Sequence, residues 1–371
     1  MLIGVPKEIK VHEYRVGLTP ASVREAVAQG HRVLVQSGAG VGIGASDDTY
    51  AAAGAEVAAG AEEVYARAEL IVKVKEPQSE ERRRLRPGQV LFTYLHLAPD
   101  PRQTRELLES GAVCIAYETV TSPSGGLPLL APMSEVAGRM AIQAGASCLE
   151  KERGGMGLLL GGVPGVAPGK VTILGGGVVG ANAALIAAGM GARVAVVDRS
   201  LEVLRRLSQS FGARVMTVFS TAEAVEQHVL SADLVVGAVL IAGAAAPRLV
   251  SAATVGRMKP GAVVVDVAID QGGCFETSRP TTHAEPTYAV DGVVHYCVSN
   301  MPGAVPRTST YALNAATLPF VLDLATEGWR AALRRDPHLR AGLNVCEGRI
   351  THPSVADALG LPCADPQQVL G

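Results

Sequence analysis

Lysine is scarce in this chain, and no segment carries a long run of charges of one sign. Seven of the 33 basic residues are lysines, and the formal net charge is −2 over 371 residues. A protein that binds nucleic acid through phosphate contacts needs a basic surface, so this balance argues against nucleic acid as the main partner. The 48% of hydrophobic residues can build large cores, which leaves small molecules and other protein chains as the expected partners.

Closely spaced cysteine pairs are also missing. The six cysteines stand at positions 114, 148, 274, 297, 346 and 363, with no C-x-x-C pair and no Cys/His spacing typical of zinc sites. The pattern excludes a small disulfide scaffold, so we expect no metal centre and reduced thiols in a cytoplasmic protein.

Export and membrane signals are weak. The first ten residues, MLIGVPKEIK, carry charges and precede no apolar stretch of the kind that a signal peptide needs. Val171 to Ala192 is 22 residues without a charge, which is long enough to span a bilayer. It holds six glycines and an asparagine, however, and a turn between strand and helix explains it better, so we expect no membrane span.

Short β-rich runs alternate with helical stretches, a pattern typical of parallel sheets covered by helices on both faces. The first series of expected strands lies at 2–6, 31–36, 69–75, 89–95 and 112–118. A second series is expected at 170–174, 192–198, 214–219, 233–239, 262–267 and 293–298. Helices are expected at 20–29 behind a Thr-Pro start, and at 99–111, 133–152, 178–190 and 200–212. After Pro306 we expect helices, no further series of strands, and a tail that packs back on the first series.

The second series opens on a glycine-rich turn, ILGGGVVGANAA, with G-x-G-x-x-G at Gly175, Gly177 and Gly180. These glycines would allow a tight turn, a close approach of a pyrophosphate, and close packing of the helix on its strand. The helix N-terminus would offer N–H groups to the phosphates. Asp198 ends the next strand, where a carboxylate accepts hydrogen bonds from a ribose diol and repels a 2′-phosphate. This favours NAD over NADP, although the neighbouring Arg199 points the other way; a glycine turn without a ligand is the alternative.

Four polar residues stand near the expected ends of strands, where open α/β sheets place their reactive groups. Arg15 and Lys75 could bind a substrate carboxylate, and His96 could give and take protons at neutral pH. Asp270 could activate a water molecule or orient an amine. The ordinary alternatives are surface cations, a core histidine and a turn aspartate. Asp266, inside a strand, is interpreted as structural.

Seven segments resemble signatures of the alanine dehydrogenase family, in the family's order and over essentially the whole chain. They are GVPKEIKVHEYRVGLTP, VKVKEP, FTYLHLA, APMSEVAGRMA, ILGGGVVGANAA, VVVDVAIDQGG and SNMPGAVPRTST. Several are shared with the NAD-binding component of proton-translocating nicotinamide nucleotide transhydrogenase. The complete set of Arg15, Lys75, His96 and Asp270 favours the dehydrogenase.

The resemblance implies reversible oxidative deamination of L-alanine to pyruvate and ammonium, with hydride transfer to NAD. It implies that His96 is the general acid/base and that Asp270 activates the water that attacks the imine. The residues it implies for substrate binding are Arg15, Lys75, Met133 and Asn300. The residues it implies for cofactor binding are Ser134, Gly175, Gly177, Val178, Val179, Gly180, Asp198, Ser220, Val239, Leu240, Val267, Ile269, Asp270, Asn300 and Met301. Some relatives carry a basic residue near the adenosine where this chain has Val203.

The strand series and the resemblance together predict an α/β protein with two Rossmann-like, doubly wound parallel-sheet domains and a cleft between them. Residues 1–130 with 305–371 would form the substrate domain, and 131–304 the NAD-binding domain. The resemblance also implies a homo-oligomer, usually a hexamer. Three alternatives stay open: the transhydrogenase component, a dehydrogenase for another small amino acid or for saccharopine, and a non-catalytic NAD-binding sensor.

Overall fold

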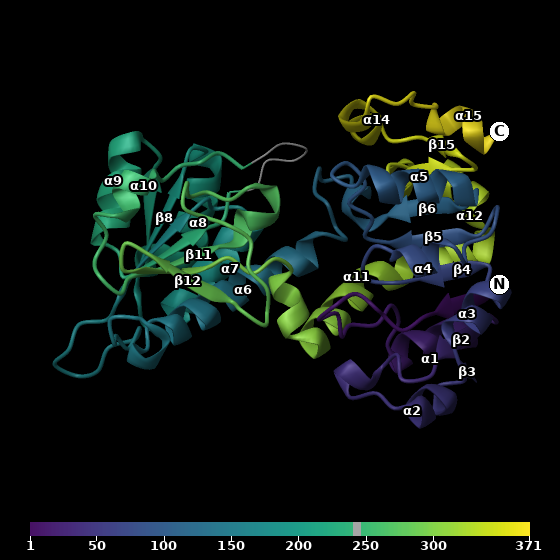
Figure 1. Cartoon of the computed structure of the whole chain (residues 1–371), viewed down its shortest axis with the longest axis horizontal. Coiled ribbons are helices and arrows are strands. Elements are labelled where there is room, and N and C mark those ends of the chain that lie inside the picture. The colour runs from purple at the N-terminus through teal and green to yellow at the C-terminus, as the bar shows by residue number, and fades with distance from the viewer. Residues whose placement is uncertain (240–245) are drawn as a thin grey trace. The chain divides into compact units, whose positions relative to one another are not determined.

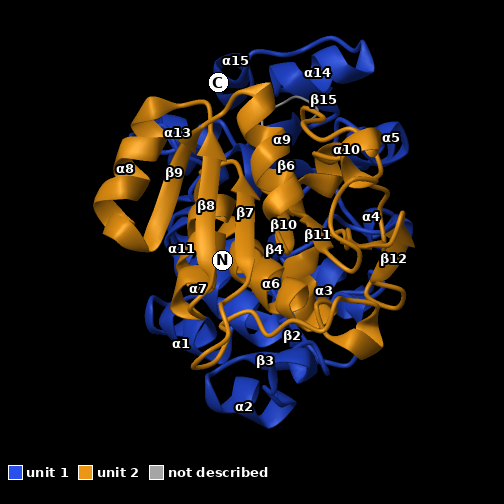
Figure 2. Cartoon of the chain, turned by 90° about the vertical axis from the view of Figure 1, so that its left-hand side faces the viewer, with its two compact units in different colours: residues 1–133, 305–371 blue, residues 134–304 orange. Residues whose placement is uncertain are grey.

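The computed structural model describes residues 1–239 and 246–371 (Figure 1). The chain divides into two compact units, and Figure 2 shows them in different colours. Unit 1 comprises residues 1–133 and 305–371, and unit 2 comprises residues 134–304. The prediction of an α/β protein with two Rossmann-like, mostly parallel sheets is confirmed.

Unit 1, all of whose residues are described, holds an eight-stranded sheet in the order β15-β14-β6-β5-β4-β1-β2-β3. Its strands are β1 (Leu2–Val5), β2 (Arg32–Gln36), β3 (Glu56–Ala58), β4 (Leu70–Val72), β5 (Val90–Thr93), β6 (Val113–Ala116), β14 (Leu343–Cys346) and β15 (Arg349–Ile350). From β6 to β3 the pairing is parallel. The central strands β4, β5 and β6 are buried along their whole length, as expected for apolar runs covered on both faces.

From β1 to β6 the helices of unit 1 alternate with the strands, and after Pro306 three helices follow one another before β14. The helices are α1 (Pro20–Ala28), α2 (Asp47–Ala52), α3 (Ala61–Arg67), α4 (Ser79–Arg82), α5 (Pro101–Ser110), α11 (Pro306–Glu327), α12 (Trp329–Arg335), α13 (Pro337–Arg340), α14 (Pro353–Leu359) and α15 (Pro366–Leu370), with 3-10 turns η1 (Val41–Ile43) and η2 (Tyr117–Thr119). The predicted start of α1 is confirmed: the Thr19 hydroxyl accepts a hydrogen bond from Ser22 N at 3.2 Å, and Pro20 follows the cap.

Two short strands lie in the tail after Pro306, where the sequence analysis expected no further series of strands. Strand β14 pairs antiparallel with β6, and β15 pairs antiparallel with β14. The LNVC run of β14 is only four residues long and lies between glycines, so its apolar pattern is too short to stand out from the helices around it. The tail therefore packs on the sheet of unit 1, as expected, by extending that sheet.

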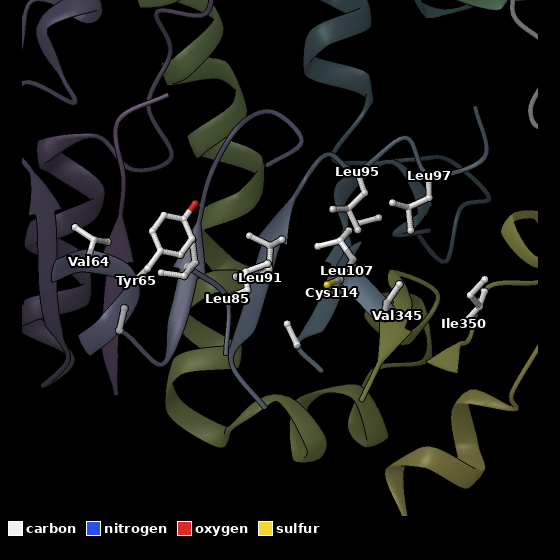
Figure 3. Close-up of a cluster of buried hydrophobic side chains, with 14 of the residues drawn as sticks. Val64, Tyr65, Leu85, Leu91, Leu95, Leu97, Leu107, Cys114, Val345 and Ile350 are labelled. Atoms are coloured by element: carbon white, nitrogen blue, oxygen red, sulfur yellow. The ribbon is translucent and has the colours of Figure 1, made fainter. Parts of the chain in front are cut away.

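One core cluster of unit 1 joins the tail to the strands that lead into polar loops (Figure 3). Leu95 and Leu97 are 0% and 2% exposed, and they pack in the same cluster as Leu107, Cys114 and Val345. Burial of each leucine contributes about 1.5–3 kcal/mol. The residue between the two leucines, position 96, is therefore held on either side by the core.

Among its described residues, unit 2 holds a seven-stranded sheet in the order β12-β13-β11-β10-β7-β8-β9. The strands are β7 (Lys170–Leu174), β8 (Arg193–Asp198), β9 (Val215–Phe219), β10 (Leu234–Gly237), β11 (Val263–Asp266), β12 (Thr287–Val290) and β13 (Val293–Tyr296). The sheet is parallel except for β12, an edge strand that the sequence analysis did not predict. The remaining elements are α6 (Ala131–Cys148), which begins in unit 1, α7 (Val178–Gly189), α8 (Leu201–Phe211), α9 (Ala222–Ser231), α10 (Ala252–Val255), η3 (Lys151–Arg153), η4 (Gly212–Arg214), η5 (Val267–Gln271) and η6 (Met301–Ala304).

The uncharged segment 171–192 forms β7, a turn and α7. Within the described parts of the chain, no helix is both long and apolar enough to cross a membrane.

Each sheet has a switch point, where the strand order reverses direction. In unit 1 the chain winds from β1 to β2 and β3, and then returns to β4 on the other side of β1. In unit 2 it winds from β7 to β8 and β9, and then returns to β10 beside β7. Ligands of open α/β sheets bind beyond the carboxyl ends of the strands at such points. The loops after β1, β4 and β7 therefore lie where a ligand of such sheets would bind.

Candidate active site

The loops after four adjacent parallel strands of unit 1 bring polar side chains to one edge of the sheet. Arg15 lies in the loop after β1, Lys75 after β4, His96 after β5 and Glu118 after β6. Parallel strands end at the same edge, so the three residues that the sequence analysis singled out in this unit share that edge.

Arg15 is not a surface cation, because its side chain is buried together with the carboxylate of Glu13, which pairs with it at two points. Its side chain is 1% exposed; Nε and Nη2 donate to the two carboxylate oxygens of Glu13 at 2.6 and 2.5 Å. Nη1 donates to the sulfur of Met133 at 3.1 Å. Burial acts to lower the pKa of Arg15, but the bond to Glu13 and the charge of that carboxylate outweigh it, so the pKa is raised. The guanidinium is a permanent, oriented cation.

His96 is not a core histidine. Its side chain is 44% exposed, and its ring stacks on Tyr94 with centroids 5.8 Å apart. The backbone lies in the left-handed region, with φ of 50°. Glu118 supports this conformation, because its carboxylate accepts hydrogen bonds from the main-chain N–H of His96 at 2.6 Å and of Leu95 at 3.2 Å. The same carboxylate lies 3.9 Å from Nδ1 of His96. The imidazole is thus exposed and oriented, as proton transfer requires.

The glycine turn of unit 2 has the backbone geometry expected from the sequence. Gly175 has φ of 99°, which L side chains rarely adopt. A Cβ at Gly180 would lie 1.8 Å from the carbonyl oxygen of Gly175, so only glycine lets α7 pack this closely. A Cβ at Gly177, the N-cap of α7, would meet nothing within 4 Å. The turn therefore leaves open space at the helix N-terminus, where Val178 and Val179 begin α7 and where a pyrophosphate would fit.

Asp198 ties the glycine turn to the end of β8. Its Oδ2 accepts a hydrogen bond from Gly176 N at 2.7 Å, and its Oδ1 accepts one from Ser200 N at 2.7 Å. The main-chain oxygen of Asp198 accepts from Ser220 N at 3.0 Å, so Ser220 lies beside this carboxylate. Val239 lies at the opposite side of the turn, near Gly175. Leu240, also expected to contact the cofactor, lies outside the described residues.

Asp270 lies in η5, directly after β11, and its side chain is exposed. Asp266 caps this turn: it is 0% exposed and accepts hydrogen bonds from Ala268 N at 3.2 Å, Cys274 N at 2.8 Å and Ser278 Oγ at 2.6 Å. Burial raises the pKa of Asp266 despite these hydrogen bonds. The structural interpretation of Asp266 is confirmed, and the residue has a further consequence, because it shapes the turn that carries Asp270.

The remaining predicted residues divide between the units. Met133 is the last residue of unit 1, and Ser134 is the first of unit 2, both on α6. Asn300 has a left-handed backbone, with φ of 62°, and its carbonyl oxygen lies 3.2 Å from Nε2 of His283. Met301 begins η6 and is buried. Val267 and Ile269 lie in the η5 turn with Asp270.

Several site residues escaped the sequence analysis, namely Glu8, Glu13, Lys73, Tyr94 and Glu118. One signal was present for Lys73, which is a charge two positions from Lys75 in a run that is otherwise apolar. Glu13 stands two residues before Arg15, but nothing in the sequence distinguishes a buried ion pair from two surface charges.

The protein is a two-unit member of the Rossmann-like class. Three features define it: a buried, oriented guanidinium, an exposed histidine, and a glycine turn of the dinucleotide-binding type. Family models match the chain in two parts: the N-terminal domain of alanine dehydrogenase/PNT matches residues 4–137, and the C-terminal domain matches residues 141–353. The chain belongs to the alanine dehydrogenase/PNT family.

Individual relatives agree along the full length. The chain is 61% identical to the alanine dehydrogenase of Halomonas elongata, with 100% of each chain covered. It is 53% identical to that of Bacillus subtilis, covering 100% of this chain and 98% of the relative. A solved structure described as L-alanine dehydrogenase matches with a TM-score of 0.94 and 52% identity, covering 97% of this chain and 99% of that one. The structure of a transhydrogenase from Sinorhizobium meliloti matches with a TM-score of 0.81 and 25% identity, covering 95% and 100%.

Proposed function

We propose that this protein is an NAD-dependent alanine dehydrogenase, which interconverts L-alanine with pyruvate and ammonium. The observation that carries the proposal is identity of 52% to 61% with alanine dehydrogenases over the whole chain. The transhydrogenase structure shares only 25%. The buried Arg15–Glu13 pair and the exposed His96 add the chemistry, since a NAD sensor would need neither a carboxylate-binding cation nor a proton carrier.

Substrate binding would begin at unit 1. The amino acid and the keto acid both carry a carboxylate, and the oriented guanidinium of Arg15 and the ammonium of Lys75 are suited to hold it. Met133, whose sulfur contacts Arg15, and Asn300 are the other residues that we propose for substrate binding. The small-molecule ligands are therefore L-alanine, pyruvate and ammonium.

Unit 2 fits a dinucleotide through three features already described: the left-handed Gly175, the open space at Gly177, and Asp198 at the end of β8. Bound NAD would supply the hydride acceptor for the α-carbon of alanine. The other proposed contacts are Ser134, Val178, Val179, Gly180, Ser220, Val239, Leu240, Val267, Ile269, Asp270, Asn300 and Met301.

Proton transfers would fall to His96 and Asp270. Loss of hydride from the α-carbon leaves an imine of the substrate, which must gain water and release ammonia. Asp270, exposed on its capped turn, would accept a proton from the attacking water. His96 would exchange protons with the substrate oxygen and nitrogen as the carbon–nitrogen bond breaks. In this scheme Glu118 acts through His96, whose backbone it holds.

A cytoplasmic homo-oligomer, in the form of a hexamer, completes the proposal and rests on the family resemblance. Size-exclusion chromatography with light scattering tests the assembly, because a hexamer would have six times the 38.3 kDa of one chain.

The first experiment measures NADH absorbance when purified protein is mixed with NAD and L-alanine at alkaline pH. We expect reduction of NAD that prefers L-alanine over glycine, serine and 2-aminobutyrate, prefers NAD over NADP, and nearly vanishes in His96→Ala. The His96→Ala variant should still bind NAD, since the glycine turn is untouched. If no amino acid is oxidised while NAD still binds, the proposal fails and a NAD sensor or transhydrogenase component becomes the better interpretation.

A further inference from the structure

A fully buried ion triad lies at the end of β4, two residues before Lys75. The ammonium of Lys73 is 0% exposed and donates to Glu8 Oε2 at 2.9 Å and to Glu81 Oε1 at 2.6 Å. Both carboxylates are only 2% exposed. Desolvation costs several kcal/mol for each buried ion, so such a triad is weak evidence for stability. A role in holding geometry explains it better.

The two carboxylates of the triad have different second partners. Glu8 Oε1 accepts hydrogen bonds from the main-chain N–H of Val74 at 2.7 Å and of Lys75 at 3.4 Å. Glu81 instead accepts from Gln78 N at 2.8 Å and from the Tyr65 hydroxyl at 3.1 Å, contacts that hold the start of α4. Of the two carboxylates, only Glu8 therefore accepts hydrogen bonds from the main chain of Val74 and Lys75.

Glu8 also belongs to the electrostatic surroundings of Arg15. Burial lowers the pKa of Arg15, and the negative charge of Glu8 is one of the contributions that raise it, after those of Glu13 and Tyr94. Burial raises the pKa of Glu8 itself, and the ammonium of Lys73 acts against that rise. The carboxylate of Glu8 accepts three hydrogen bonds at its two oxygens, one from Lys73 Nζ and two from the main-chain N–H groups of Val74 and Lys75.

We propose that Glu8 is a positioning residue for the substrate-carboxylate site, because it fixes the main chain of Val74 and Lys75 and so sets where the ammonium of Lys75 stands. The assignment rests on the proposed function, in which Lys75 binds the substrate carboxylate. Lys73 is the buried counter-charge of Glu8, and its ammonium acts against the rise in the pKa of Glu8 that burial causes.

The test compares Glu8→Gln with Glu81→Gln, which is a matched control. Both variants remove one buried carboxylate from Lys73, but only Glu8→Gln weakens the acceptor for Lys75. We expect Glu8→Gln to raise the KM for L-alanine and for pyruvate by about tenfold or more, with kcat lowered less than about threefold and the KM for NAD unchanged. Glu81→Gln should lower Tm to a similar extent while both substrate KM values stay within about twofold.

Amide hydrogen exchange gives a second measurement that does not depend on activity. Exchange at Val74 and Lys75 should become faster in Glu8→Gln and stay as in the wild type in Glu81→Gln. If Glu8→Gln does not fold, Glu8→Asp serves instead, since its carboxylate retreats by one methylene from the main-chain donors.

Equal rises in KM in both variants would overturn the proposal, and so would an unchanged KM in Glu8→Gln with lowered Tm. Either result would make Glu8 a structural residue only. A wild-type protein that oxidises no amino acid would refute the proposed function instead, and the exchange data would still decide whether Glu8 fixes the Lys75 segment.

Discussion

Replacement of Glu118 by glutamine should impair turnover without impairing cofactor binding. Glu118 supports a histidine whose left-handed backbone is unfavourable by about 1–2 kcal/mol for a residue with a Cβ. In the wild type its two oxygens accept from the N–H groups of Leu95 and His96. The glutamine side chain keeps one oxygen that can accept a hydrogen bond. Its NH2 group is a donor and would face a main-chain N–H, which is also a donor.

The size of the effect follows from these bonds. A hydrogen bond to a charged group contributes about 1.5–3 kcal/mol, and Glu118→Gln removes the charge and at least one bond. If the substitution destabilises the His96 conformation by about 2 kcal/mol, the population of that conformation falls by roughly 30-fold. Any rate that depends on this population falls by the same factor. We therefore expect kcat for L-alanine oxidation to fall by about 10- to 30-fold.

The assay is steady-state NADH formation at saturating L-alanine and NAD, with NAD affinity measured separately by fluorescence titration. Glu109→Gln on the exposed part of α5 is the control, and its kcat should match the wild type. A kcat for Glu118→Gln within twofold of the wild type, in protein with unchanged Tm, would refute the reasoning.

Three further outcomes follow from the same geometry. Arg15→Lys keeps the charge but loses the two-point pairing with Glu13, so the KM for L-alanine should rise by about tenfold or more; an unchanged KM would remove Arg15 from the site. Asp266→Asn tests a buried carboxyl whose pKa is raised above 3.8 by burial. Because the folded state holds this proton more tightly than the unfolded state, the wild type loses stability as pH rises above about 4, until the folded pKa is passed. Urea unfolding at a series of pH values should therefore show that the free energy of unfolding of Asp266→Asn rises relative to that of the wild type over this range. Parallel curves for the two proteins would contradict the burial argument. Gly180→Ala places a Cβ against the carbonyl of Gly175, which should cost about 1–3 kcal/mol of stability and weaken NAD binding. Thermal unfolding and NAD titration measure the two effects. The control is Gly189→Ala on the same helix, where a Cβ meets nothing within 4 Å.

The sequence predicted the sheets of both units well, because buried parallel strands are continuous apolar runs and stand out from the helices between them. It failed at β14, where four residues between glycines give no period to recognise. It also placed the end of β4 at Lys75, whereas the strand ends at Val72. The N–H of Val74 donates to Glu8 instead, a contact across 66 positions that no local pattern contains.

The candidate site was predictable in part for the same reason. Arg15, Lys75, His96 and Asp270 follow strands, so the general rule for open sheets finds them. The carboxylates that hold them depend on pairing between loops distant in the sequence. Glu118 stands 22 residues from His96, and its role becomes visible only when β5 and β6 lie side by side.

The discontinuous course of unit 1 has a consequence for synthesis of the chain. Strand β6 leaves the ribosome early, but its antiparallel neighbour β14 follows only after the whole of unit 2 has been made. At a translation rate of about 5–20 residues per second, the outer edge of β6 waits roughly 11 to 45 s for its partner. During that interval the nascent chain carries unpaired N–H and carbonyl groups on the outer edge of β6, and such an edge is a template for pairing with another chain until β14 covers it.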